Sequence, residues 1–393
     1  MRRDAPPAPP IRSRGCRSGV RSVVAAVGAF AALLGTTRAP PAAAPAEPLC
    51  RFPGPWVRYE RPARASDGTH PSPLGIAADP SVVRDATDPS RMRMYFTNAD
   101  SRGRVGIALA EGRDGSTWDA WRRPASPDPL VDLVLAPPPG AWDSQGIETA
   151  NVVRADGHYR MYYTGNRAPG GSATYAVGLA TSPDGVRWTR RAAPVLEPLR
   201  DWERPLCADP ADPATCRGGG VLEPSVLRDP RTGGWRMWYA ALGEPAGSFR
   251  TFRVGHATSP DGVRWARHPR PVLEPGAPGA WDSMWVSHAN VVADPRAGFH
   301  MFYFGSAPGD HREGVEIQRG ALGHAYSPDG LRWERNPANP ILAPRPDGPD
   351  AWSLGGPTAL VEGGRVRLWY FASPTGGLAS EVVLAEAPCG GGG

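Results

Sequence analysis

Short apolar runs separated by turn residues recur along most of the chain. The runs are rich in Val, Tyr, Trp and Met, and Asp-Gly, Gly-Gly or Pro-Asp-Gly separates several of them. Tight turns between β-branched and aromatic runs are typical of β-hairpins. Successive units of the chain contain four such runs each, and four antiparallel strands per unit make up one blade of a propeller.

The most regular of these turns is a seven-residue phrase. It reads "SPDGVRW" at residues 182–188 and 259–265 and "SPDGLRW" at residues 327–333. We expect Pro-Asp-Gly to form the turn between the third and fourth strands, and the Trp to pack against the neighbouring blade. The phrase is similar to the structural Asp-box of sialidases. A structural role on the face opposite the functional site is therefore the prediction.

Alignment of the first strands places five residues at one position: Asp79, Thr149, Glu223, His288 and Gly356. Their intervals of 70, 74, 65 and 68 residues predict an all-β fold, a five-bladed β-propeller over residues 47–393. The fifth unit lacks a fourth run, and residues 55–64, "PWVRYERPAR", match it. We expect this N-terminal strand to complete the last blade and close the ring without an open edge.

One apolar run, at residues 23–35, has a different context. Arg12, Arg14, Arg17 and Arg21 precede it, and a Pro/Ala-rich stretch with Ala-Pro-Ala at residues 44–46 follows it. This order predicts a secretory signal peptide over residues 1–46, too short to span a bilayer as a stable anchor. An uncleaved signal anchor is the alternative. The mature chain is expected to be secreted or periplasmic, with no membrane contact after cleavage.

Export changes how the cysteines are interpreted. Cys50, Cys207, Cys216 and Cys389 remain after the leader, and an even number in an oxidising compartment predicts two disulfides. Cys207–Cys216 would close a short loop, and Cys50–Cys389 would tie the two ends of the mature chain together. No Cys-x-x-Cys spacing occurs, which disfavours a zinc site.

Charge excludes further classes of function. All 44 basic residues are Arg, so a Schiff-base lysine and a P-loop lysine are both excluded. The net charge is +5, and the Arg residues are scattered among Asp and Glu without the basic stripe that nucleic acid requires. We expect a monomer with no nucleic-acid partner.

Two carboxylates are the strongest candidates for chemistry. Asp79 in "ADPSVV" and Glu223 in "LEPSVL" occupy the aligned position two blades apart. Two acids facing each other across a cleft are the minimal equipment for glycoside hydrolysis, because one protonates the leaving oxygen while the other activates water or attacks the sugar. The alternative is that Asp-Pro and Glu-Pro only begin strands.

These motifs and the five-unit length resemble the arabinanase/levansucrase/invertase superfamily, with glycoside hydrolase family 43 as the nearest pattern. The resemblance implies a carbohydrate substrate, Asp79 as general base, Glu223 as general acid, and inversion. It also implies a third carboxylate on blade two, where this chain has Thr149. Glu148 precedes Thr149 and Asp143 lies further upstream. A bulge in the strand would bring Glu148 to the site.

His288 takes the aligned position on blade four. Some members of the resembling family place a His near a central ion, so a structural Ca²⁺ in the channel is one expectation, and a hydrogen bond inside the channel is the alternative. No other cofactor and no other metal is expected. Further candidates for binding substrate, each with solvation or interblade packing as its alternative, are Asn98, Trp142, Asp143, Asn166, Arg167, Trp202, Trp281, Asp282, Trp285 and His288 itself.

Two classes of function follow from these residues. The first is a secreted hydrolase that cleaves glycosidic bonds of a poly- or oligosaccharide. The second is a catalytically inactive propeller that binds glycan or protein on the same face, which the missing blade-two acid favours. A sialidase is a more distant third, because that fold has six blades and an arginine cluster that is not found here.

Overall fold

The chain folds into β-sheets. The computed structural model describes residues 47–389, except 60–62, 71, 73, 86, 122–131, 168–173, 205, 208–215, 218, 244–250 and 313–316. Over these residues it contains strands and two short 3-10 helices, η2 (Asp201–Glu203) and η4 (Pro308–Asp310), and no α-helix. No helix in this part of the chain is long and apolar enough to cross a membrane. The expected leader, residues 1–46, lies outside the described residues.

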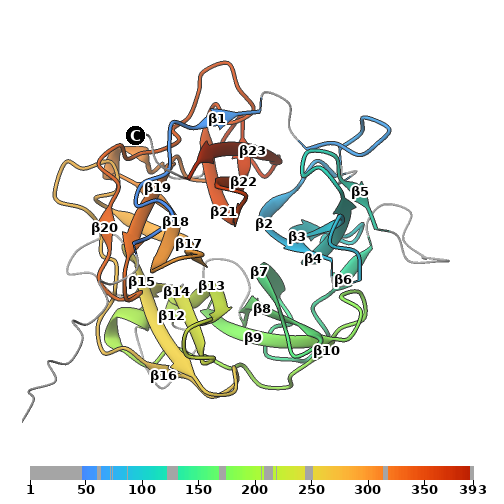
Figure 1. The fold of residues 1–393 in the computed structure, drawn as a ribbon. Helices are drawn as coiled ribbons and strands as arrows, with labels where there is room; N and C mark the ends of the chain where they lie inside the picture. The colour runs from blue at the N-terminus through green and yellow to red at the C-terminus, as the bar shows by residue number, and fades with distance from the viewer. Residues whose placement is uncertain are drawn as a thin grey trace, which may run out of the picture. The chain divides into compact units, whose positions relative to one another are not determined.

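The strands follow the units expected from the sequence (Figure 1). Each unit begins with a long inner strand and continues outward through antiparallel neighbours. The first unit contains β2 (Ala78–Arg84), β3 (Met92–Ala99), β4 (Val105–Gly112), β5 (Asp119–Ala120) and β6 (Leu133–Leu135). The second contains β7 (Gly146–Ala155), β8 (His158–Asn166), β9 (Thr174–Ser182) and β10 (Thr189–Arg190).

The later units have the same order. The third contains β13 (Gly219–Arg228), β14 (Trp235–Gly243), β15 (Thr251–Ser259) and β16 (Ala266–Arg267). The fourth contains β17 (Trp285–Ala293), β18 (Phe299–Ser306), β19 (Ala321–Ser327) and β20 (Glu334–Arg335). The fifth contains β21 (Ser353–Glu362), β22 (Arg365–Ser373) and β23 (Glu381–Pro388), and β1 (Val57–Arg58) pairs antiparallel with β23.

The five inner strands contact one another in cyclic order. β2 touches β7, β7 touches β13, β13 touches β17, β17 touches β21, and β21 touches β2. The side chain at one position of each strand accepts a hydrogen bond from a backbone N–H of the next strand. The pairs are Ser81 with Val152 (2.9 Å), Asn151 with Val226 (2.8 Å), Ser225 with Val291 (2.8 Å), Asn290 with Ala359 (3.0 Å) and Thr358 with Val82 (3.4 Å).

The core lies between neighbouring units rather than inside any one of them. One buried cluster joins Met94 and Phe96 of the first unit to Trp369 of the fifth, and another joins Tyr95 of the first unit to Met161 of the second. Alternation along each strand places successive side chains on opposite faces of a sheet, so every sheet packs against two neighbours. No unit can bury its apolar surface alone.

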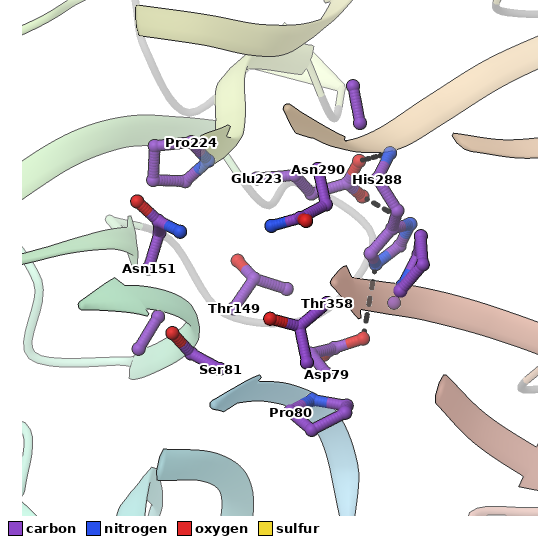
Figure 2. A pocket seen from close by; sticks show the side chains of 14 residues that line it. Asp79, Pro80, Ser81, Thr149, Asn151, Glu223, Pro224, His288, Asn290 and Thr358 are labelled. Atoms are coloured by element: carbon purple, nitrogen blue, oxygen red, sulfur yellow. Dashed lines mark hydrogen bonds and ion pairs between the residues drawn. The ribbon is translucent and has the colours of Figure 1, made fainter. Parts of the chain in front are cut away.

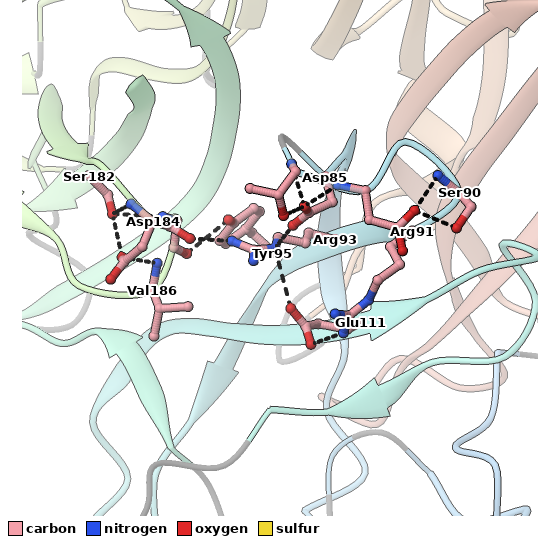
Figure 3. Close-up of polar contacts among 12 residues, drawn as sticks. Asp85, Ser90, Arg91, Arg93, Tyr95, Glu111, Ser182, Asp184 and Val186 are labelled. Atoms are coloured by element: carbon pink, nitrogen blue, oxygen red, sulfur yellow. Dashed lines mark hydrogen bonds and ion pairs between the residues drawn. The ribbon is translucent and has the colours of Figure 1, made fainter. Parts of the chain in front are cut away.

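The repeated "SPDGxxW" turns hold adjacent units together, as the sequence predicts. In the second unit, Trp188 packs edge-on against Tyr95 of the first unit at 5.7 Å between ring centroids. The hydroxyl of Tyr95 donates a 2.9 Å hydrogen bond to the carbonyl of Gly185, and Arg93 donates to the carbonyl of Asp184 (Figure 3). The turn is therefore a structural joint.

The N-terminal segment supplies the same contacts to the fifth unit. Trp56 packs edge-on against Phe302 of the fourth unit at 5.9 Å, and β1 lies beside β23 at the top of Figure 1. The predicted Cys50–Cys389 disulfide is confirmed, with 5.0 Å between the Cα atoms.

The second expected bridge is not tested. β11 (Leu206–Cys207) pairs antiparallel with β12 (Cys216–Arg217), and Cys207 is directly opposite Cys216. The side chains of both residues lie outside the described part of the chain, so the bridge stays a prediction.

Candidate functional site

All five aligned positions share an uncommon backbone conformation. Each inner strand has a shift in register there, and each residue has a positive φ: Asp79 (49°), Thr149 (48°), Glu223 (53°), His288 (45°) and Gly356 (50°). Positive φ is rare for residues other than Gly and gathers at functional sites. A bulge redirects side chains that strict alternation would point elsewhere.

The five positions line a narrow axial cavity (Figure 2). Its volume of about 40 Å³ is enough for water and too small for a sugar ring. Asp79, Thr149, Glu223 and His288 also line an adjoining pocket of about 390 Å³. The second volume lies within the range of small-molecule sites, so the adjoining pocket is the candidate substrate site.

The imidazole of His288 lies between the two aligned carboxylates. Its Nε2 is 3.2 Å from Oδ1 of Asp79, and its Nδ1 is 3.2 Å from Oε1 of Glu223. The backbone N–H of His288 donates to Oε2 of Glu223 at 2.6 Å. Burial lowers the pKa of His288, but the carboxylates of Glu223 and Asp79 outweigh it and raise that pKa to about 9. An imidazolium flanked by two acids results at neutral pH.

Asp79 is oriented by its own unit. The hydroxyl of Thr97 donates to Oδ2 of Asp79 at 3.3 Å and accepts the backbone N–H of Thr149 at 2.9 Å. Thr149, which stands where the resembling family has its third acid, bonds through its hydroxyl to the hydroxyl of Thr164. Thr149 therefore links β7 to β8 and brings no carboxyl to the site.

The second unit does bring one acid to the larger pocket, Glu148. The register shift in β7 falls between Glu148 and Asn151, and Glu148 lines the larger pocket with Asp79 and Glu223. Burial raises the pKa of Glu148 to about 7, and the nearby charges of Asp79 and Glu223 add to this rise. The bulge that the sequence could only suggest is present.

The rest of the larger pocket is apolar and aromatic. Of the ten residues predicted to bind substrate, Trp285 and His288 line it. Sequence reasoning missed four of the wall residues: Tyr175, Leu222, Leu242 and Phe252. Leu222 directly precedes Glu223, but nothing in the sequence distinguishes any of the four from core residues.

The "AWDS" motifs are placed elsewhere. Asp143 is fully buried, accepts a 2.8 Å hydrogen bond from the hydroxyl of Tyr163 and pairs with Arg190 at 2.7 Å. Asp282 likewise accepts hydrogen bonds from the hydroxyl of Tyr303 and from the guanidinium of Arg335. Both carboxylates are committed to structural bonds. Asp143 also lines neither of the two cavities, so it is not placed to supply the missing blade-two acid.

The Trp residues of the same motifs pack against these Tyr rings. Trp142 stacks on Tyr163 at 6.3 Å and Trp281 on Tyr303 at 5.7 Å. Trp202 does the same with Tyr239 at 6.2 Å. Packing against these Tyr rings, rather than stacking on a sugar ring, therefore accounts for all three Trp side chains.

The polar candidates at the ends of second strands are also outside the two cavities. Asn98 is buried, and its Oδ1 accepts from Ser72 at 3.2 Å. Arg167 forms an ion pair with Glu197 and lies over the Trp142 ring at 5.6 Å. Asn166 pairs through its backbone with Gly146 at the end of β8.

The axis does not fit the expected calcium ion. Calcium takes six to eight oxygen ligands, whereas the Asp79 and Glu223 carboxylates both face the His288 ring. Among the described residues, Cys50, His300 and Cys389 form the group with metal-ligand spacing, and its two sulfurs are joined as a disulfide.

Comparisons of the sequence with known proteins find two distant relatives. No family model matches the chain. Two uncharacterized proteins of Mycobacterium tuberculosis are 26% identical to it over 216 residues. The match spans 54% of this chain and 60% of each relative.

The similar solved structures are more informative about the fold. A glycoside hydrolase superposes with a TM-score of 0.61 at 19% identity, covering 79% of this chain and 87% of its own. A thermostable family-43 glycoside hydrolase superposes with a TM-score of 0.58 at 17% identity, covering 78% of this chain and 88% of its own. An α-L-arabinofuranosidase from Lactobacillus brevis superposes with a TM-score of 0.57 at 14% identity, covering 83% of this chain and 94% of its own. The resemblance inferred from the sequence is confirmed for the fold.

Proposed function

We propose that the chain is a glycoside hydrolase that cleaves a neutral poly- or oligosaccharide with water as the acceptor. The observation that carries this proposal is the set of three acids, Asp79, Glu148 and Glu223, beside an aromatic wall in one pocket. Sugar rings present C–H faces that pack on aromatic side chains and hydroxyls that bond to carboxylates. A pocket for binding alone does not require three adjacent acids.

Asp79 is the proposed general base. Its carboxylate is oriented by Thr97 and faces the imidazole of His288. The proton donor is one of the two glutamates, Glu223 or Glu148. The resemblance to glycoside hydrolase family 43 implies inversion, in which the base and the proton donor lie roughly 6.5–9.5 Å apart with room for a water between them. Inversion is therefore proposed.

Water is favoured over phosphate as the acceptor. A β-1,2-mannobiose phosphorylase from Listeria innocua also superposes on this chain, with a TM-score of 0.58 at 15% identity. Phosphate needs cationic partners, whereas the described residues lining the larger pocket include three acids, one His and no Arg. A phosphate acceptor would meet like charge there.

The proposal includes the architecture and location expected from the sequence. Five blades with a ring completed by β1 are supported by the cyclic contacts of the inner strands and by the pairing of β1 with β23. A mature domain over residues 47–393, exported by the leader at residues 1–46, is supported by the Cys50–Cys389 disulfide, which forms in oxidising compartments. A monomer is part of the same proposal.

A substrate screen tests the function. The mature protein is assayed on aryl glycosides, arabinan, xylan, fructan and β-1,2-mannobiose, each with and without phosphate. Release of reducing sugar without phosphate is expected, and Asp79→Asn is expected to reduce turnover by several orders of magnitude with the fold intact. Strict dependence on phosphate would show a phosphorylase. Binding of glycans without turnover would show the inactive propeller.

A further inference from the structure

The two glutamates of the pocket have opposite surroundings. The carboxylate of Glu223 is surrounded by donors: the backbone N–H of His288 at 2.6 Å, the ring of His288 at 3.2 Å, and the hydroxyl of Ser287. Both oxygens of Glu223 are thus directed to the protein. Burial raises the pKa of Glu223, and the donors of His288 and Ser287 oppose that rise, because donors of this kind stabilise a carboxylate and compete with its proton.

Glu148 has no such donors. In the described part of the chain, no hydrogen-bond donor acts on its carboxyl, and the groups that face it are Asp79 of β2, Glu223 of β13 and His288 of β17. Glu148 does not line the narrow axial cavity but does line the larger pocket, together with Trp285 and Phe252.

We infer that Glu148, and not Glu223, is the proton donor of the proposed hydrolysis, and that Glu223 fixes the position of His288. This inference rests on the proposed function. Two adjacent acids cannot both ionise cheaply in a buried site, so the one without donors keeps its proton. The pKa of Glu148, raised to about 7, gives a donor that is about half protonated at neutral pH and is strong enough to act.

The step balances without a further reagent. The proton of the Glu148 carboxyl moves to the glycosidic oxygen as the bond between that oxygen and the anomeric carbon breaks, and the bonding electron pair stays on the leaving oxygen. A water oxygen bonds to the anomeric carbon from the opposite side and gives its proton to Asp79. Asp79 ends protonated, Glu148 ends ionised, and solvent exchange restores both.

The leaving group distinguishes the two glutamates. A dinitrophenyl glycoside of the active sugar needs no protonation to leave, whereas the matching alkyl glycoside does. Glu148→Gln is expected to lose about 10²–10⁴-fold in kcat on the alkyl glycoside and less than about tenfold on the dinitrophenyl one. Its pH profile is expected to lose the alkaline limb near pH 7. Glu223→Gln is expected to lower kcat by a similar factor on both glycosides and to keep the alkaline limb of the pH profile.

The reverse pattern, with Glu223→Gln selective for the alkyl glycoside, would overturn the inference. Glu334→Gln, at an exposed position far from the pocket, is the matched control for a Glu-to-Gln change. Infrared difference spectra of the carboxyl groups give an activity-independent readout. A protonated carboxyl that titrates near pH 7 should be present in the wild type and in Glu223→Gln and absent from Glu148→Gln.

If Glu148 is ionised at pH 6 in these spectra, the inference fails whatever the enzyme's activity. If no glycoside in the screen is cleaved but Glu148 titrates near pH 7, the proposed function fails, and the assignment of the proton to Glu148 stands. The two failures are thereby distinguished.

Discussion

Arg58 and Asp350 form a buried ion pair of 2.7 Å between segments 292 residues apart. The pair repeats the bond between Arg190 and Asp143 in the second unit. In that unit, the Arg comes from the unit's own fourth strand, β10. In the fifth unit the N-terminal strand β1 supplies it, so β1 has the bonding role of a fourth strand as well as its position.

Arg58→Met is therefore expected to destabilise the fold by about 2–4 kcal/mol, because the buried carboxylate of Asp350 loses its main partner. Arg345, at 3.2 Å, remains as a weaker one. Chemical denaturation monitored by Trp fluorescence measures the change. Arg51→Met is the control, since its partner Glu334 is exposed, and it should cost less than about 1 kcal/mol. Equal losses in the two variants would contradict a closing role for β1.

The repeated turns allow a second test with a matched pair of glycines. Gly185 and Gly157 have φ values of 74° and 78°. A Cβ on Gly185 would meet Arg93 and lie 2.7 Å from the hydroxyl of Tyr95, whereas one on Gly157 would meet nothing within 4 Å. Gly157→Ala should cost about 1–2 kcal/mol from backbone strain alone. Gly185→Ala should cost about 1–3 kcal/mol more, and thermal denaturation compares them. Equal costs would mean that the turn does not depend on contact with the first unit.

The raised pKa of Glu148 predicts a dependence of stability on pH. Since that pKa rises from 4.5 to about 7 on folding, the folded chain keeps a proton that the unfolded chain releases. The stabilisation is full below about pH 4.5 and is lost as pH rises to about 7. Between pH 5 and 7.5 the wild type should lose on the order of 2 kcal/mol more than Glu148→Gln, after allowance for partial exposure. Urea denaturation at both pH values measures the difference, and parallel curves for the two proteins would refute the shift.

The disulfide gives a fourth prediction. Cys50–Cys389 closes a loop of 339 residues, and cross-links over long loops stabilise by restricting the unfolded chain. Replacement of both residues by Ser should cost about 3–5 kcal/mol. Reductant should lower the melting temperature of the wild type and leave the variant unchanged. A reductant effect in the variant would instead point to the Cys207–Cys216 pair.

The order of strands could be predicted from the sequence because the repeats carry the signals that make them. Pro-Asp-Gly and the Trp four residues after the Asp form the same joining turn in three of the five units, so they recur in the sequence. The aligned position was found for the same reason. Asp79, Thr149, Glu223, His288 and Gly356 share one backbone conformation, and their equivalence was detectable before that conformation was known.

The site was harder to predict, because the role of a side chain depends on the residues that it contacts in the folded chain. Trp142 and Asp143 have the residue types of a sugar-binding pair, and only Tyr163 and Arg190 make them structural. Glu148 required a bulge that alternation does not reveal. The imidazole between Asp79 and Glu223 depends on distances across the axis that no local pattern encodes.

The cycle of five side-chain-to-backbone bonds among the inner strands has a consequence for the number of repeats. The fifth unit contributes Gly356 and no acid to the axis, yet Asn290 and Thr358 connect it to the fourth unit and to the first. Loss or duplication of any unit would change the circumference of this cycle and with it the spacing of Asp79, Glu148 and Glu223. The fifth unit, although it supplies no acid, therefore acts as a spacer that sets the distances between the acids of the other units.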